Sequence, residues 1–274
     1  MTQSSLRHRF AAGERLLGSF VKTASVSSIE ILALAGFDFV IIDEEHAPIG
    51  RESTDVLLLA ARAHGIQALV RVRDNAAPDI LSALDCGADG VLVPHVHSTG
   101  AAERMVTAAY YRIGRRGFSP SGRAGAYGNT TLKGHIASQD EKIALIAMIE
   151  DPEAVVAIDN ILQTEGVEGI FIGRGDLAAA LGAETMNDPQ VEDAVHRVLA
   201  AARAAGKPVC MMAETPAMAD DFAARGATAF IIGSDQAFLK SGAAEARRVF
   251  AADRATASPA TAARRTSGHE TERH

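Results

Sequence analysis

The stretch FDFVIIDEEHAPIG, residues 37–50, decides which fold this sequence predicts. Its first half is apolar, β-branched and aromatic, which is typical of a parallel strand that is covered on both faces. Three carboxylates and an imidazole follow at once, and Pro48 and Gly50 then end any regular structure. Catalytic groups of α/β proteins lie where parallel strands end, so the stretch predicts a strand that leads into a site. The alternative is an acidic, solvated turn with a surface histidine.

Within this stretch, Asp43 stands three residues before His46. Across a tight turn, a carboxylate at that spacing can hold one ring nitrogen of the imidazole and leave the other nitrogen to move a proton. We therefore expect His46 to be a general base that Asp43 orients.

Strand–helix units repeat along residues 6–250 with short connections between them. Eight such units in a chain of this length favour a closed (β/α)8 TIM barrel over a doubly wound sheet, which is the alternative. A helix over residues 236–250 is expected to complete the last unit. The expected strands are residues 17–21, 38–42, 67–72, 90–93, 143–149, 167–172, 208–212 and 229–232.

The segment 112–134 interrupts this pattern after the fourth unit, and we expect it to be irregular. It holds four arginines, at positions 112, 115, 116 and 123. It is either a lid or subunit contact that carries positive charge toward anionic substrates, or a solvated loop.

Residues 251–274 are rich in Ala, Thr, Ser and Arg and lack a periodic apolar pattern. We therefore divide the chain into a barrel domain, residues 1–250, and a disordered C-terminal tail, residues 251–274. The tail contains the string GHETERH, but its second histidine comes one residue too late for the i, i+4 spacing of a helical zinc motif.

The composition narrows the functional class. The chain has 274 residues, 47% of them hydrophobic, and its net charge of −7 argues against nucleic acid as a partner. No apolar run is long enough for a membrane span, and the N-terminus lacks the apolar core of a signal peptide. Cys86 and Cys210 lie far apart on apolar elements, which is typical of buried free thiols. These features predict a cytoplasmic protein that does not bind membranes.

Polar side chains mark the ends of three further strands: Arg71 ends the third, Glu150 the fifth, and Asp176 follows the sixth. All face the same rim of a barrel, and one unit separates Glu150 from Asp176, so their carboxylates can converge. Two oxygen ligands without cysteine suit Mg²⁺ or Mn²⁺, with water and substrate filling the other positions. The alternative is that these carboxylates cap the helices that follow.

Four segments of the chain resemble the HpcH/HpaI family of class II, divalent-metal-dependent pyruvate aldolases. They are FDFVIIDEEHAPIG, ALVRV, MIED and GIFIGRGDLAAALG, and the resemblance covers roughly residues 6–250. It implies a (β/α)8 barrel in a homo-oligomer, a hexamer or a trimer, whose last helix is exchanged between neighbours in many members. It also implies cleavage of a 4-hydroxy-2-oxo acid to pyruvate and an aldehyde, through a metal-bound pyruvate enolate. Mg²⁺ or Mn²⁺ is the metal that it favours, with Co²⁺ and Zn²⁺ as further candidates.

The resemblance also assigns roles to residues. It implies that His46 is the base, held by Asp43, and that Arg71 contacts the keto oxygen. Glu150 and Asp176 become the metal ligands. Backbone N–H groups of Gly175 and Asp176, which open a helix, are expected to bind the pyruvate carboxylate.

Three residues depart from the family pattern: Glu44 replaces a small residue, Met148 a glutamine and Arg174 a proline. We expect Arg174 to set substrate preference by pairing with a second anionic group. Glu45 matches the family glutamate and is expected beside the metal ligands. No lysine stands among the strand-end candidates, which argues against a Schiff-base aldolase.

Two other functions stay open at this point. One is a citrate-lyase-like acyl-CoA lyase on the same barrel, which needs a basic surface for coenzyme A. The other is a catalytically silent barrel that binds 2-oxo acids. His95 and His97, which follow the fourth strand, are expected in a loop or pocket wall rather than among the metal ligands.

Overall fold

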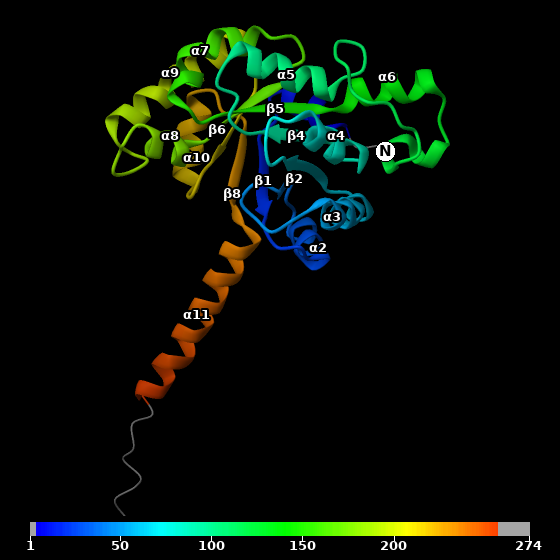
Figure 1. The fold of residues 1–274 in the computed structure, drawn as a ribbon. Helices are drawn as coiled ribbons and strands as arrows, with labels where there is room; N and C mark the ends of the chain where they lie inside the picture. The colour runs from blue at the N-terminus through cyan, green and yellow to red at the C-terminus, as the bar shows by residue number, and fades with distance from the viewer. Residues whose placement is uncertain (1–3, 257–274) are drawn as a thin grey trace, which may run out of the picture. The chain divides into compact units, whose positions relative to one another are not determined.

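The computed structural model describes residues 4–256, and within them eight parallel strands close into a barrel in the order β1 to β8 (Figure 1). This closure confirms the predicted (β/α)8 fold and excludes the doubly wound sheet. The strands are β1 (Leu16–Val21), β2 (Phe39–Asp43), β3 (Gln67–Arg71), β4 (Gly90–Val93), β5 (Ala144–Ile149), β6 (Gly169–Ile172), β7 (Val209–Met212) and β8 (Ala229–Ser234).

Helices alternate with these strands, and in the barrel unit the helices between strands lie outside the ring that the strands form (Figure 1). The helices of residues 4–256 are α1 (Leu6–Ala11), α2 (Val26–Leu34), α3 (Arg51–His64), α4 (Ala77–Asp85), α5 (Thr99–Ala109), the 3-10 helix η1 (Arg123–Gly128), α6 (Leu132–Lys142), α7 (Pro152–Gln163), α8 (Arg174–Ala180), α9 (Pro189–Ala205), α10 (Pro216–Ala224) and α11 (Asp235–Thr256).

The interior of the barrel is apolar where the strands begin. Alternate residues of each strand point inward, and they form one buried cluster together with Leu6 and Phe10 of α1. The ring of Phe10 meets the ring of Phe39 edge to face, with 5.7 Å between the ring centres. Helix α1 therefore closes this end of the barrel. Outward-facing strand residues pack beneath the surrounding helices in a second, larger cluster.

Gly18 in β1 makes room for this packing. A Cβ atom at this position would lie 2.5 Å from a ring carbon of Phe39 and 2.8 Å from a methyl carbon of Ile231. Any side chain here would displace the Phe39 ring, so the strand needs a glycine where a neighbouring aromatic ring fills the interior.

Helix α6 is the main departure from the predicted elements. The segment 112–134 was expected to be irregular, but it contains η1 and the first residues of α6, which leads into β5. The helix carries little apolar periodicity, because the residues that it buries, His135 and Gln139, are polar. A pattern of apolar residues therefore could not predict it.

The C-terminal part of the described chain forms a unit of its own, which begins at Gln236. The expected helix over residues 236–250 is present in α11, but α11 extends to Thr256 and so includes the start of the predicted tail. Residues 257–274, the rest of that tail, lie outside the described residues. Between residues 4 and 256, no helix combines the length and the hydropathy that crossing a membrane requires.

Candidate active site

Three buried polar residues lie at the carboxyl ends of the strands. Asp43 ends β2, Arg71 ends β3 and Glu150 directly follows β5, and they are 0%, 4% and 2% exposed. The register of β2 and β3 pairs Asp43 with Arg71. Asp43 is therefore not solvated, contrary to the alternative of a solvated acidic turn, whereas His46 is exposed as that alternative has it. Each of the three points inward because it stands two residues after an inward-facing side chain of its own strand: Ile41, Leu69 and Met148.

Asp43 and Arg71 form a two-pronged ion pair. Arg71 donates from Nε to Asp43 Oδ1 at 2.9 Å and from Nη2 to Oδ2 at 2.6 Å. Lys22 brings its Nζ to 3.1 Å from Asp43 Oδ2. Burial alone would raise the pKa of Asp43, but the hydrogen bonds and charge of Arg71, with smaller help from His46 N–H and Lys22, lower it. The fork fixes the orientation of the guanidinium at the barrel mouth.

Lys22 is a site residue that the sequence reasoning missed. It directly follows β1, so it is a lysine at a strand end, contrary to the expectation that none stands there. Its Nζ also lies 5.8 Å from the centre of the Phe20 ring. The signal was present in its position after an apolar strand, but a single lysine beside Thr23 and Ser25 gave it no distinctive motif.

The expected contact between Asp43 and the His46 ring is absent from the structure. Asp43 Oδ1 instead accepts hydrogen bonds from the backbone N–H groups of His46, at 3.1 Å, and Glu45, at 3.2 Å. The reason is that Arg71 and Lys22 occupy the rest of the carboxylate. The His46 ring is half-exposed, and its Nε2 lies 3.6 Å from Glu45 Oε2. Asp43 thus holds the backbone of this turn and not the imidazole.

The two glutamates after Asp43 have different surroundings. Glu44 is buried and accepts a hydrogen bond from the Thr54 hydroxyl. Glu45 turns toward the mouth, with Oε2 3.3 Å from Arg71 Nη1 and Oε1 3.8 Å from His95 Nε2. Its Oε2 is buried and accepts no hydrogen bond from the described residues. Burial, opposed by the charge of Arg71, raises the pKa of the Glu45 carboxyl.

Glu150 is the carboxylate of this rim whose pKa is raised the most. Its Oε1 accepts a hydrogen bond from the backbone N–H of His95 at 2.8 Å. Burial, assisted by the negative charges of Asp176 and Glu45, raises the pKa of Glu150 to about 7. A Cβ atom on Gly173 would lie 3.0 Å from Glu150 Oε2, so the missing side chain leaves space beside this oxygen. Asp176 is exposed in the first turn of α8, as is Gly175 beside it.

His95 takes a part in the site that was not expected. It adopts φ +52°, a left-handed conformation that is uncommon outside glycine. Its ring Nδ1 lies 3.3 Å from an oxygen of Asp151 and 3.5 Å from Glu150 Oε1. Burial alone would lower the pKa of the His95 imidazole. The negative charges of Glu150, Asp151 and Glu45 outweigh this effect, so the pKa is raised. His97 is exposed and its Nδ1 lies 2.9 Å from the His95 carbonyl oxygen, which fits the expected loop position.

Arg174 does not have the free guanidinium that was expected of it. The residue is 8% exposed, and its Nη2 donates to Met186 O at 2.6 Å, to Asn187 Oδ1 at 2.9 Å and to Glu192 Oε1 at 3.0 Å. The guanidinium carbon also lies 5.3 Å from the centre of the Phe222 ring. Arg174 therefore ties α8 to α9 and α10, and its pairing with a substrate anion stays a prediction.

The donors at this rim fit a hard divalent cation. Glu150 and Asp176 supply carboxylate oxygens, the buried Glu45 Oε2 lacks a hydrogen-bond donor, and Gly173 leaves space beside Glu150. In residues 4–256 no group of three or more His, Cys, Asp or Glu side chains is arranged to hold a metal. Two protein carboxylates suit Mg²⁺ or Mn²⁺, which keep several waters or substrate oxygens in their coordination.

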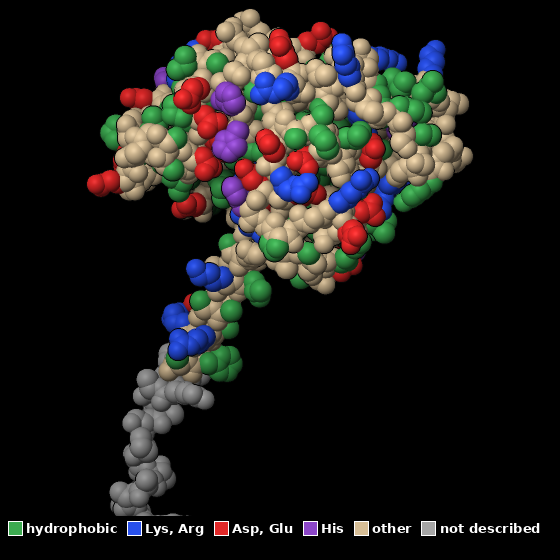
Figure 2. Space-filling model, in the orientation of Figure 1, with side chains coloured by type: hydrophobic (Ala, Val, Ile, Leu, Met, Phe, Trp, Pro, Cys, Tyr) green, Lys and Arg blue, Asp and Glu red, His purple; other side chains and the backbone are tan. Residues whose placement is uncertain are grey.

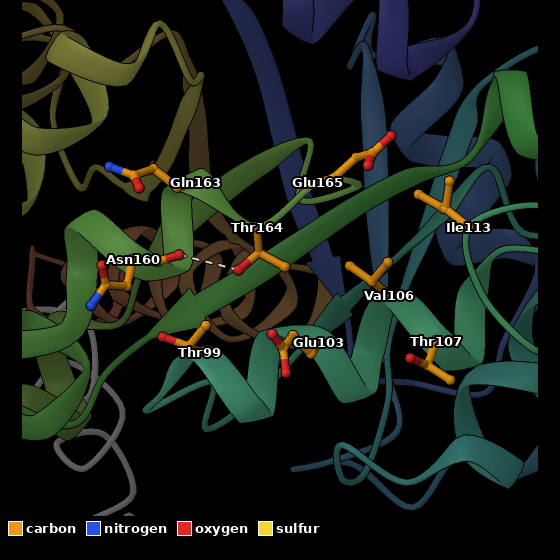
Figure 3. A pocket seen from close by; sticks show the side chains of 9 residues that line it. All are labelled: Thr99, Glu103, Val106, Thr107, Ile113, Asn160, Gln163, Thr164 and Glu165. Carbon is orange, nitrogen blue, oxygen red and sulfur yellow. Dashed lines mark hydrogen bonds between the residues drawn. The ribbon is translucent and has the colours of Figure 1, made fainter.

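In Figure 2, histidine and acidic side chains lie close together on the face of the barrel unit that the view presents. A different hollow, a groove of about 650 Å³ between α5 and α7, is drawn in Figure 3. Its carboxylates, Glu103 and Glu165, are exposed, and it is lined by no cation, histidine or cysteine. The hydrogen bond drawn there, from the Thr164 hydroxyl to Asn160 O, only closes the end of α7. Catalytic groups therefore gather at the strand ends and not in this groove.

Comparisons with known proteins agree with this geometry. Residues 16–241 match the family model described as HpcH/HpaI aldolase/citrate lyase. The chain is 36% identical over 233 residues to the 5-keto-4-deoxy-D-glucarate aldolase of Citrobacter koseri, which covers 84% of this chain and 90% of that protein.

Solved structures resemble the barrel as well. The citrate synthase SbnG superposes with a TM-score of 0.84 at 33% identity, and the match covers 92% of this chain and 99% of that one. An HpcH/HpaI aldolase from Desulfitobacterium hafniense DCB-2 superposes with a TM-score of 0.85 at 26% identity, covering 94% and 99% of the two chains.

Proposed function

Because the chain belongs to the HpcH/HpaI aldolase/citrate lyase family and is a divalent-metal-dependent aldolase, we propose that it cleaves a 4-hydroxy-2-oxo sugar acid. Cleavage of the bond between C3 and C4 releases pyruvate and an aldehyde. The observation that carries this proposal is the burial of Glu150, which is 2% exposed and forms no ion pair with a lysine or arginine among the described residues, so that its pKa is raised to about 7. A cation at this place gives the carboxylate its charge partner.

Glu150 and Asp176 are the proposed metal ligands. Their oxygens point to Mg²⁺ or Mn²⁺ as the ion, with Co²⁺ and Zn²⁺ as weaker candidates. When bound, such an ion acts as a Lewis acid for the negative charge that develops on the keto oxygen. Glu45 lies beside these ligands, where its charge attracts the ion and keeps Arg71 in place.

Arg71 is proposed to bind the keto oxygen as well. The fork to Asp43 uses two of the five N–H groups of its guanidinium. Of the remaining N–H groups, those on Nη1 lie near Glu45 Oε2, at 3.3 Å, and the fixed positive charge is proposed to stabilise the negative charge that appears during cleavage. Asp43 is then a positioning residue, because it acts through Arg71 and through the backbone of His46.

His46 is proposed to accept the proton of the C4 hydroxyl, directly or through one water, as the C3–C4 bond breaks. Its ring is half-exposed at the mouth, with Glu45 as the carboxylate nearest to its Nε2. Backbone N–H groups of Gly175 and Asp176 are proposed to bind the substrate carboxylate, since the first turn of a helix leaves its N–H groups without acceptors.

The aldolase relatives suggest 5-keto-4-deoxy-D-glucarate as the first substrate to test. We also propose a cytoplasmic location and a homo-oligomer, a hexamer or a trimer, in which neighbours exchange the last helix. Sedimentation velocity of the full chain tests the oligomer, because a monomer would contradict it.

Chelation tests the function directly. The purified chain is treated with EDTA, and pyruvate release from 5-keto-4-deoxy-D-glucarate is followed with a coupled lactate dehydrogenase assay. We expect release to stop and to return with Mg²⁺ or Mn²⁺. Full activity after exhaustive chelation would contradict the metal, while cleavage of a citryl thioester alone would place the chain with the acyl-CoA lyases.

A further inference from the structure

A second pocket, of about 400 Å³, lies at the other end of the barrel from the active site. It is lined by the end of α3, by residues at the starts of β3 and β4, and by one face of α6. The catalytic candidates stand at the carboxyl ends of the same strands. Strands of four or five residues rise about 3.3 Å per residue, so roughly 15 Å of barrel separates the two places. Nothing in the proposed aldolase reaction uses this pocket.

The face of α6 toward the pocket is polar. Gln139 is 2% exposed, and its Nε2 donates to Ala124 O at 3.1 Å, which fixes which way the amide points. Its Oε1 then has no hydrogen-bond donor among the described residues. Lys142 lies three residues further along the helix, on the same side. A buried amide oxygen without a partner is uncommon, and it indicates a missing donor group.

Two of the three cations that line this pocket lack an ion-pair partner among the described residues, and one of these two, Arg62, is exposed. No described residue makes a hydrogen bond or ion pair with the side chain of Lys142 or of Arg62, although both line the pocket. Arg123, by contrast, is neutralised by Asp55 at 3.0 Å. Burial lowers the pKa of Lys142, an effect that Asp89 opposes and that the charges of Arg116 and Arg62 increase. With Arg123 paired to Asp55, the two cations Lys142 and Arg62 outnumber the single carboxylate Asp89, so the local field is positive.

Asp89 is the one carboxylate that lines the pocket. One of its oxygens, Oδ2, accepts the backbone N–H of Ala68 at 2.9 Å. The pocket thus offers two sets of groups: positively charged N–H donors of Lys142 and Arg62, and acceptor oxygens of Gln139 and Asp89. A simple anion satisfies only the first set, and a neutral alcohol only the second.

We propose that this pocket binds a small hydroxylated oxyanion, whose anionic group pairs with Lys142 and Arg62 and whose hydroxyl donates to Gln139 Oε1. The anionic group is a phosphate or a carboxylate, as in a sugar phosphate or a sugar acid. Because the site lies opposite the catalytic rim, its ligand does not need to be the aldol substrate.

Isothermal titration calorimetry of the full chain with four probes tests this. Glycerol 3-phosphate carries hydroxyl groups and a phosphate, and D-glycerate carries hydroxyl groups and a carboxylate. Sulfate has the negative charge without a hydroxyl donor on carbon, and glycerol has the hydroxyl groups without the charge. We expect glycerol 3-phosphate or D-glycerate to bind at least tenfold more tightly than sulfate, and glycerol not to bind. The tighter of the two identifies the anionic group. Equal binding of all anions, or no binding, would overturn the proposal.

Variants assign the binding to this pocket. Lys142→Met should weaken binding of the preferred probe at least tenfold. Gln139→Leu should reduce the affinity for that probe to the affinity for sulfate. Lys133→Met, on the exposed side of the same helix, is the matched control and should change nothing. Circular dichroism establishes that each variant is folded.

Hydrogen exchange of the wild-type chain gives a second measurement that needs no variant. The preferred probe should slow amide exchange in α6 and at the start of β4. If protection is confined to residues 43–46 and α8, the probe occupies the active site and the inference is overturned. Binding of the probe that is unchanged in Lys142→Met would overturn it as well. Pyruvate release by Lys142→Met in the absence of probe is expected to equal that of the wild type, which separates this test from that of the aldolase.

Discussion

The two ends of the barrel interior differ in their side chains: one end is apolar and the other is charged. Where the strands begin, Leu6, Phe10 and Phe39 fill the space with apolar side chains, and α1 covers them. Where the strands end, Asp43 and Glu150 are just as deeply buried but carry charge. Apolar burial stabilises the fold by about 25 cal/mol per Å². Buried charges cost free energy unless they are paired, and the only basic group at ion-pair distance from Glu150 among the described residues is the His95 imidazole, at 3.5 Å.

This difference separates stability from function along one set of strands. We expect substitutions at the apolar end to change the free energy of unfolding and leave turnover of the folded enzyme intact. Substitutions at the charged end should change turnover first.

Glu150→Gln should have the largest effect. It keeps the shape of the side chain but removes the proposed metal-ligand charge, so kcat/KM for pyruvate release should fall by about 10³-fold or more. The urea midpoint of unfolding, measured on the same preparation, should not decrease. Glu165→Gln, an exposed substitution in the groove between α5 and α7, is the control and should behave as the wild type. If Glu150→Gln keeps the turnover of the wild type, the charged end of the barrel is not the part that determines activity.

Phe10→Ala tests the apolar end. Removing a ring that is 2% exposed leaves a cavity against Phe39, and urea unfolding should show a loss of about 3–5 kcal/mol. At a temperature where the variant is folded, its kcat should stay within about twofold of the wild type. A tenfold loss of kcat without loss of stability would show that the two ends are not independent.

His46→Ala should slow cleavage by about 10²-fold, the range for losing acid–base catalysis. Its half-exposed ring makes little contact with the core, so the unfolding midpoint should hardly move. Steady-state kinetics with and without added imidazole measures this, because the small base can replace the lost ring. Wild-type cleavage by the variant would make the imidazole a bystander.

Asp43→Asn should affect both properties modestly. The pKa of Asp43 is lowered in the folded protein, so its charge stabilises the fold above its unfolded pKa near 3.8 and this contribution is lost as pH falls through the folded value. At pH 6 the variant should lose about 1.5–3 kcal/mol, as for hydrogen bonds to charged groups. Urea unfolding at pH 6 and pH 3 measures the difference. A deficit that grows toward pH 3 would contradict the sign.

The fold was predictable because each strand is a short apolar run and each connection is short. Closure then brought Asp43, Arg71 and Glu150 together, since parallel strands end at one rim. Helix α6 was not predictable, because its buried face consists of His135 and Gln139 and carries no apolar period.

Among the site residues, too, positions were predictable from the sequence but side-chain partners were not. Position after a strand identified Asp43 and Glu150, but partners are a matter of three-dimensional contact. Arg71 takes the carboxylate that was expected to hold His46, and Glu192 takes the guanidinium of Arg174 that was expected to meet substrate. Lys22 and the strained His95 entered the site without any sequence motif.

The central claim is that Glu150 and Asp176 hold the divalent ion of this aldolase, and Mn²⁺ binding tests it most directly. Isothermal titration of the EDTA-treated, dialysed chain with Mn²⁺ should show one site per chain. The affinity should fall at least tenfold in both Glu150→Gln and Asp176→Asn and be unchanged in Glu165→Gln. Mn²⁺ binding that is the same in all four proteins would contradict the claim.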